Sequence, residues 1–229
     1  MELIIIIVAI TAIIVIYSMM NMKIKELKAI ALNKELNEIA KKLPTNKEIC
    51  EQILKKLGNN TTKIEENENS EATLYIAIQD KITIGNTHES FTRIQTVAHE
   101  CLHSIQDKKM LIFNFIFSNI YLAFFIIICI LTICKKLSNE IMYSNIFLIL
   151  SFIYYVIRVF LENDAMIKAK FLAKEYMESK KLLSKQEINS ILDKYEQITK
   201  ISGPFTIANI LVGSFVGILV YSTIALIKI

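Results

Sequence analysis

The chain has 229 residues, of which 53% are hydrophobic and 21% charged, and its formal net charge is +4. A mean hydropathy of +0.43 excludes an ordinary soluble domain unless the apolar residues are collected in separate segments. The positive balance does not indicate nucleic-acid binding, because the lysines are interspersed with glutamates along predicted helical faces instead of clustering with aromatic residues.

Four stretches are nearly uncharged, and they cover residues 3–22, 110–134, 141–161 and 205–227. Each is about as long as the roughly 20 residues that a helix needs to cross a bilayer. The sequence therefore predicts a mainly α-helical membrane protein with about four transmembrane helices. These are an N-terminal anchor over residues 1–22, a hairpin of two helices over residues 110–161 and a C-terminal helix over residues 205–229.

Lysine is concentrated in the two polar segments, residues 23–109 and 162–204, whereas the turn between the second and third helices has only Lys135 and Lys136. By the positive-inside rule, both polar segments are predicted to be cytoplasmic and both termini to lie outside. The first helix is expected to be a retained anchor, because it lacks the basic residues that begin a signal peptide. The chain is thus predicted to be a multi-pass protein of the cell membrane, in contact with the lipid bilayer.

The first polar segment is predicted to begin with two helices. The first membrane helix is expected to continue into the cytoplasm until Pro44 breaks it. A short second helix is predicted to run from a cap at Asn46 to Gly58, where glycine is well suited to end it.

After this helix, the spacing of the apolar residues changes from the helical period to alternation. The polar residues 59–71 are expected to form a flexible loop, and the alternation over residues 73–85 predicts a β-hairpin. Asn86 or Thr87 is a candidate cap for the next helix, whose apolar positions follow the 3.6-residue period. The non-membrane part is therefore expected to be of the α+β class.

The second polar segment is predicted to be helical. Ser184 and Glu187 form a capping-box pattern ahead of an apolar stripe that ends before Gly203 and Pro204. This stripe is expected to pack on the first polar segment, and the alternative is that it lies on the membrane surface. Further on, a G-x-x-x-G pattern is typical of helix packing within or between chains, so the oligomeric state stays open.

The sequence VAHECLHSIQ, residues 97–106, is predicted to lie on the helix that follows the hairpin. His99 and His103 are one helical turn apart, so both imidazoles can reach one ion, and Glu100 is rotated by about 100° from His99. This H-E-x-x-H pattern predicts one Zn²⁺ per chain, with the histidines as ligands and Glu100 as the general base that takes a proton from a zinc-activated water. The third histidine, His88, is predicted to be a surface or capping residue.

A catalytic zinc site needs a third protein ligand, and the third membrane helix returns the chain to the same membrane face. Glu162 is the preferred ligand and Asp164 the alternative. Ala165, Ala169 and Ala173 form a stripe that allows close helix packing, and Glu162 lies within about 60° of it whereas Asp164 points about 200° away from Glu162. Asp164 is then expected to support the site by a hydrogen bond to one of the ligand side chains or to a neighbour of one.

The sequences HECLHSIQ and ENDA, in this order, resemble the YugP-like membrane zinc metallopeptidases, also called neutral zinc metallopeptidases type 2. The resemblance runs over nearly the full length and implies a zincin-like fold in which Glu162 of ENDA is the zinc glutamate. The chain departs from the family pattern at Leu102, where glycine is usual, and it lacks the Asp-His-Tyr-Asp-Pro stretch that usually precedes the hairpin.

In folds of this kind, an edge strand above the zinc takes an extended peptide by β-addition. The resemblance therefore implies that one strand of the hairpin binds substrate, and the residues expected to do so are Tyr75, Ile76, Ala77 and Ile78.

Together these observations predict a membrane-bound zinc endopeptidase of the gluzincin-like H-E-x-x-H type. Its partners are expected to be membrane-associated or misfolded protein substrates. The alternative is a catalytically inactive zinc-binding scaffold or chaperone-like protein. A transporter is disfavoured, because Arg158 is the one charge that the predicted membrane spans hold.

Overall fold

A computed structural model describes residues 2–70, 72–86 and 90–227. The chain divides into two compact units. The apolar unit consists of residues 1–24, 113–160 and 204–229, and the mixed unit consists of residues 25–112 and 161–203.

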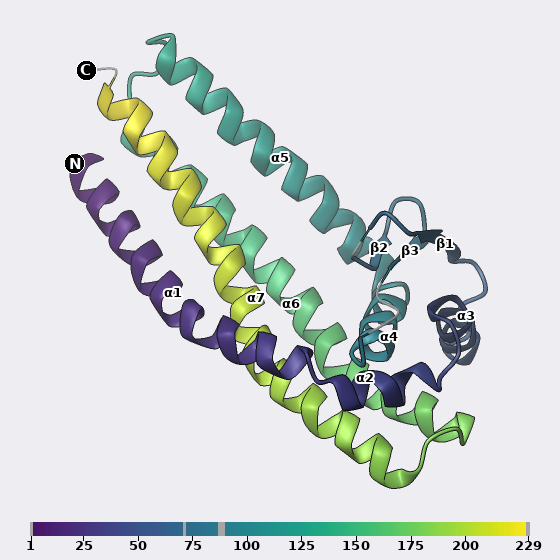
Figure 1. The fold of residues 1–229 in the computed structure, drawn as a ribbon. Helices are drawn as coiled ribbons and strands as arrows, with labels where there is room; N and C mark the ends of the chain where they lie inside the picture. Colours follow the sequence, from purple (N-terminus) through teal and green to yellow (C-terminus); the bar gives the residue numbers. More distant parts are fainter. Residues whose placement is uncertain (1, 71, 87–89, 228–229) are drawn as a thin grey trace. The chain divides into compact units, whose positions relative to one another are not determined.

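Four long helices supply the apolar unit: α1 (Glu2–Ala31), α5 (Lys108–Ile133), α6 (Glu140–Lys180) and α7 (Lys185–Ile227) (Figure 1). Among the described residues, these four are long and apolar enough to cross a membrane, which confirms the predicted set of apolar helices. A Cβ atom added to Gly217 would lie 2.8 Å from Cζ of Phe147, whereas one on Gly213 would meet no described atom within 4 Å. Gly217 of the G-x-x-x-G pattern therefore serves helix packing within the chain.

The ends of several helices differ from those predicted. The first helix breaks before Pro44, because the Asn33 side chain accepts a hydrogen bond from the Leu36 backbone N–H and so caps α2 (Lys34–Lys41). Helix α3 (Asn46–Lys56) is capped by Thr45, in a capping box with Glu48, and not by Asn46.

The helix that carries the predicted apolar stripe, α7, continues through Gly203 and Pro204. A proline inside a helix removes one backbone hydrogen bond, and long apolar helices tolerate this where neighbouring groups compensate. The predicted start of this helix is confirmed, because Ser184 and Glu187 exchange both hydrogen bonds of the capping box. Its stripe of Ile188, Ile191 and Tyr195 is buried, as expected, in the core of the mixed unit.

The mixed unit contains a three-stranded sheet in the order β1 (Lys63–Asn67), β3 (Lys81–Gly85), β2 (Leu74–Ile76). Strands β2 and β3 are antiparallel and form the predicted hairpin. Strand β1 lies in the stretch that was predicted to be a flexible loop and pairs in parallel with β3. Ala77 and Ile78 follow β2 in the turn, so the predicted edge strand is shorter than residues 75–78.

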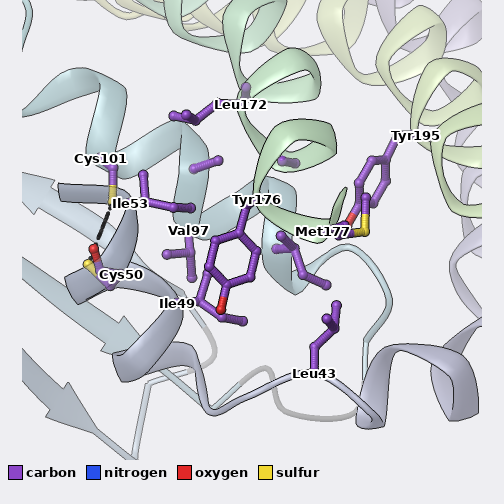
Figure 2. Packing of buried hydrophobic residues seen from close by; sticks show 14 of the residues in the cluster. Leu43, Ile49, Cys50, Ile53, Val97, Cys101, Leu172, Tyr176, Met177 and Tyr195 are labelled. Atoms are coloured by element: carbon purple, nitrogen blue, oxygen red, sulfur yellow. Dashed lines mark hydrogen bonds between the residues drawn. The ribbon is translucent and has the colours of Figure 1, made fainter. Parts of the chain in front are cut away.

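Helix α4 (Arg93–His103) carries the H-E-x-x-H pattern and begins later than predicted, since Asn86 lies just after β3. Thr87 and His88 lie outside the described residues. Helices α3, α4 and α6 meet in one hydrophobic core, where Ile53, Val97 and Tyr176 contribute buried side chains (Figure 2). This core holds α4 against the part of α6 that follows residue 161.

Candidate metal centre

The first two groups of the site come from α4. His99 and His103 are one turn apart, and their Nε2 atoms are 3.0 Å from each other. The two rings are nearly perpendicular, with an angle of 89° between their planes. Both Nε2 atoms therefore point to the same small region, as the i, i+4 spacing predicts.

Glu162 of α6 supplies the third group. Its Oε2 atom lies 3.4 Å from Nε2 of His99 and 3.7 Å from Nε2 of His103. The three side chains are 20%, 11% and 14% exposed in the order His99, His103, Glu162, so the cluster is largely buried but reachable from solvent. Two imidazoles and one carboxylate in this arrangement could hold a metal ion.

The alanine stripe of α6 explains why Glu162 reaches α4. Ala165, Ala169 and Ala173 are at most 1% exposed and lie in the same core as α4. Small side chains allow two helix backbones to approach closely, and Glu162 precedes Ala165 by three residues, so it projects from nearly the same face. Asp164 is not part of the three-residue cluster.

Gln106 connects the cluster to Asp164. Its Nε2 donates to the backbone oxygen of Leu161 at 2.8 Å and to Oδ2 of Asp164 at 3.2 Å, while its Oε1 lies 2.8 Å from Nδ1 of His103. Because the amide nitrogen already faces two oxygens, the amide oxygen must accept from His103. The proton of neutral His103 is therefore on Nδ1, which leaves the Nε2 lone pair for a metal.

Gln106 is not among the site residues that the sequence predicts. It follows the end of α4 by three residues, and its partners on α6 are more than 50 residues away in the chain. Burial lowers the pKa of His103, but hydrogen bonds with Glu162 and Gln106 outweigh this effect and raise the pKa above its ordinary value when no metal is bound. A metal ion at this site would therefore compete with a proton for His103.

Glu100 faces the sheet as well as the histidines. Its Oε2 accepts a hydrogen bond of 2.7 Å from the backbone N–H of Tyr75 in β2. Burial raises the pKa of Glu100, and the nearby His99 and His103 together with the Tyr75 N–H reduce this rise. A carboxylate with a raised pKa is better matched to proton transfer near neutral pH than an exposed one.

The hairpin that holds Tyr75 is itself fixed at its turn. The Tyr75 hydroxyl donates to Oδ1 of Asp80 at 3.0 Å, and Asp80 also accepts from the hydroxyls of Thr61 and Thr62. Asp80 has a backbone φ of +46°, a conformation that Asp and Asn adopt more readily than most residues. These contacts fix the position of the β2 backbone that touches Glu100.

Leu102 belongs to the hydrophobic core and is 6% exposed. Leucine is larger than the glycine of the family pattern, and its side chain is accommodated by packing on the core side of α4.

The chain matches no protein-family model, and neither a curated protein nor a solved structure matches it.

Proposed function

We propose that this protein is a membrane-bound zinc-dependent endopeptidase that cleaves membrane-associated or misfolded proteins. The observation that carries the proposal is the partly buried carboxylate of Glu100 beside the cluster of His99, His103 and Glu162. A metal site with a purely structural role has no use for an acid at this position, and it usually has a fourth protein ligand. Glu100 therefore favours an enzyme over an inactive scaffold.

The distances within the cluster support zinc as the metal. In a tetrahedral zinc site with bonds of 2.0–2.1 Å, ligand atoms are separated by about 3.4 Å. The separations between the ligand atoms here are 3.0, 3.4 and 3.7 Å, close to that value without any metal present. Two histidines and one glutamate are also the ligand set of known catalytic zinc sites, which keep one position open.

Zinc bound here would supply Lewis acidity that polarises the scissile peptide carbonyl and makes water in the site more acidic. Glu100 accepts the proton of the attacking water and then donates it to the leaving amine nitrogen. The Tyr75 N–H holds the Glu100 carboxylate in place for both transfers. Strand β2 lies at an edge of the sheet next to this base. Because the Tyr75 N–H is bonded to Glu100, an extended substrate that adds to this edge would pair with other backbone groups along it.

The distribution of lysine supports a cytoplasmic position for the mixed unit, with both termini outside. Glu162 directly follows the apolar residues 141–161 in the sequence. A zinc ligand next to a membrane span favours substrates that lie in or on the bilayer.

Chelation tests the proposal on the purified full-length chain in detergent, with unfolded casein as reporter. We expect cleavage that 1,10-phenanthroline stops and added zinc restores, because the three side chains would release the ion and bind it again. Zinc binding without cleavage of casein or of co-expressed membrane proteins would favour the scaffold instead.

Replacing Gln106 by alanine is expected to lower zinc affinity by about 10- to 100-fold, because the partner that orients His103 is lost. Affinity is measured by competition with a chromogenic chelator. Gln95→Ala is the matched control, since Gln95 lies on α4 but its side chain bonds to Thr199 and not to a histidine of the cluster. Equal affinities for the two variants would show that Gln106 does not orient the ligand.

A further inference from the structure

A second feature of the mixed unit lies between α6 and α7, at a cavity of about 330 Å³. Its apolar wall and its charged rim are formed by Met166, Ile167, Lys170 and Phe171 of α6, with Glu196 and Lys200 of α7. The charged residues belong to neither the metal cluster nor its hydrogen-bonded supports.

The rim carries more positive than negative charge. Nζ of Lys170 lies 2.7 Å from Oε2 of Glu196, and Nζ of Lys200 lies 2.9 Å from Oε1 of the same carboxylate. Two ammonium groups thus share one carboxylate, which leaves a net charge of about +1 on the three side chains. Each ammonium has three N–H donors, so an additional anion can be bound without displacing Glu196.

The wall beside this rim is apolar and open. Ile167 and Phe171 are one helical turn apart on α6 and are 64% and 65% exposed. Exposed large apolar side chains next to a charged rim are typical of surfaces that meet another apolar group. An amphipathic ligand with an anionic end and a hydrocarbon chain matches both halves of the cavity.

The position along the two helices agrees with such a ligand. Lys200 is five residues before the apolar stretch 205–227, and Lys170 is nine residues beyond the stretch 141–161. These separations correspond to about 7 Å and about 14 Å of helix, and the polar headgroup layer of a bilayer is about 5–8 Å thick on each side. By this count Lys200 falls at the depth of the headgroups and Lys170 a few Å outside them, from where its long side chain can extend back to a lipid phosphate.

We propose that this cavity binds an anionic phospholipid such as phosphatidylglycerol. The phosphate is held by Lys170 and Lys200, and one acyl chain lies against Ile167, Phe171 and Met166. Basic pockets between helices on the cytoplasmic side of a membrane are suited to anionic headgroups. The lipid would contact the part of α6 that follows Glu162, so the site links the lipid composition of the membrane to the helix that carries a candidate zinc ligand.

Titration of the full-length chain in detergent with dihexanoyl-phosphatidylglycerol tests this proposal, with native mass spectrometry to count bound lipid. We expect the double variant Lys170→Gln, Lys200→Gln to weaken binding by about 30-fold, since two phosphate contacts are lost. Glu196→Gln is expected to strengthen binding, because it removes a negative charge that repels the phosphate while both lysines remain. Lys174→Gln, Lys194→Gln is the matched control, with the same change in net charge at positions that do not line the cavity.

Two further ligands separate the possible sources of the anion. Dihexanoyl-phosphatidylcholine and glycerol 3-phosphate are both expected to bind at least tenfold more weakly than the anionic lipid, because one lacks the net charge and the other the acyl chains. Equal binding of glycerol 3-phosphate would overturn the lipid assignment in favour of a soluble phosphate. Equal loss in the control variant, or no gain for Glu196→Gln, would overturn the site itself.

Discussion

Glu100→Gln should reduce kcat/KM for peptide cleavage by about 10²–10⁴-fold, the usual contribution of a positioned general base, while the chain keeps its zinc. Glutamine has the shape of glutamate but cannot take up the proton of the attacking water. Its amide oxygen can still accept the 2.7 Å hydrogen bond from the Tyr75 N–H, so the sheet should stay in place. Cleavage rates of a quenched fluorescent peptide and zinc content per chain are measured on the same preparation.

Glu178→Gln makes a suitable control, because Glu178 lies far along α6 and has a weak pairing with Lys174 at 3.9 Å. It should leave both quantities unchanged. If Glu100→Gln cleaved peptide as fast as the wild type, Glu100 would not be the base. If the variant lost its zinc, the effect would be one of metal binding and not of proton transfer.

Arg93→Met is expected to lower the free energy of unfolding of the mixed unit by at least about 3 kcal/mol. Arg93 is 3% exposed, and its guanidinium donates to four oxygens. They are the backbone oxygens of Ala40, Leu43 and Pro44 and the side-chain oxygen of Asn46. Methionine fills the space of the aliphatic stem but leaves these acceptors buried without donors.

The structural reason for this large effect is the position of Arg93 in the chain. It is the first residue of α4, and its partners are the end of α2, the turn after it and the start of α3. Burial lowers the pKa of Arg93, but arginine stays protonated in proteins. One cation thus joins three helices and sets the start of the helix that carries His99.

Thermal unfolding followed by near-ultraviolet circular dichroism and by limited proteolysis measures this effect. Lys174→Met is the control, since Lys174 is on the exposed surface of α6. Arg93→Lys should be intermediate, because an ammonium has three donors and cannot reach all four oxygens. An unchanged unfolding midpoint in Arg93→Met would show that the carbonyl groups find other donors.

The apolar helices and the position of Glu162 could be predicted because both depend on local patterns. An uncharged run of about 20 residues indicates a membrane-spanning helix regardless of the rest of the sequence. The angle between Glu162 and the alanine stripe is fixed by helix geometry. Ala165 and Ala169 are buried, so the predicted face of α6 is the one that packs against α4.

Other features depend on contacts between distant residues, and a single sequence does not show these. Strand β1 has one apolar residue, Ile64, and exists because β3 lies beside it and Lys81 pairs with Glu65. Arg93 looks like an exposed charge near a helix start, because its acceptors lie about 50 residues earlier in the chain. Gln106 is similar, with a helix more than 50 residues later as its partner.

Zinc content per chain, measured by inductively coupled plasma mass spectrometry, tests most directly whether His99, His103 and Glu162 together hold one zinc ion. Wild type, Glu162→Ala and Asp164→Asn are purified in detergent and dialysed against the same weak chelator. We expect one zinc per chain in the wild type and in Asp164→Asn and a clear loss in Glu162→Ala. A wild type without zinc, or a Glu162→Ala variant that keeps as much as Asp164→Asn, would contradict this assignment.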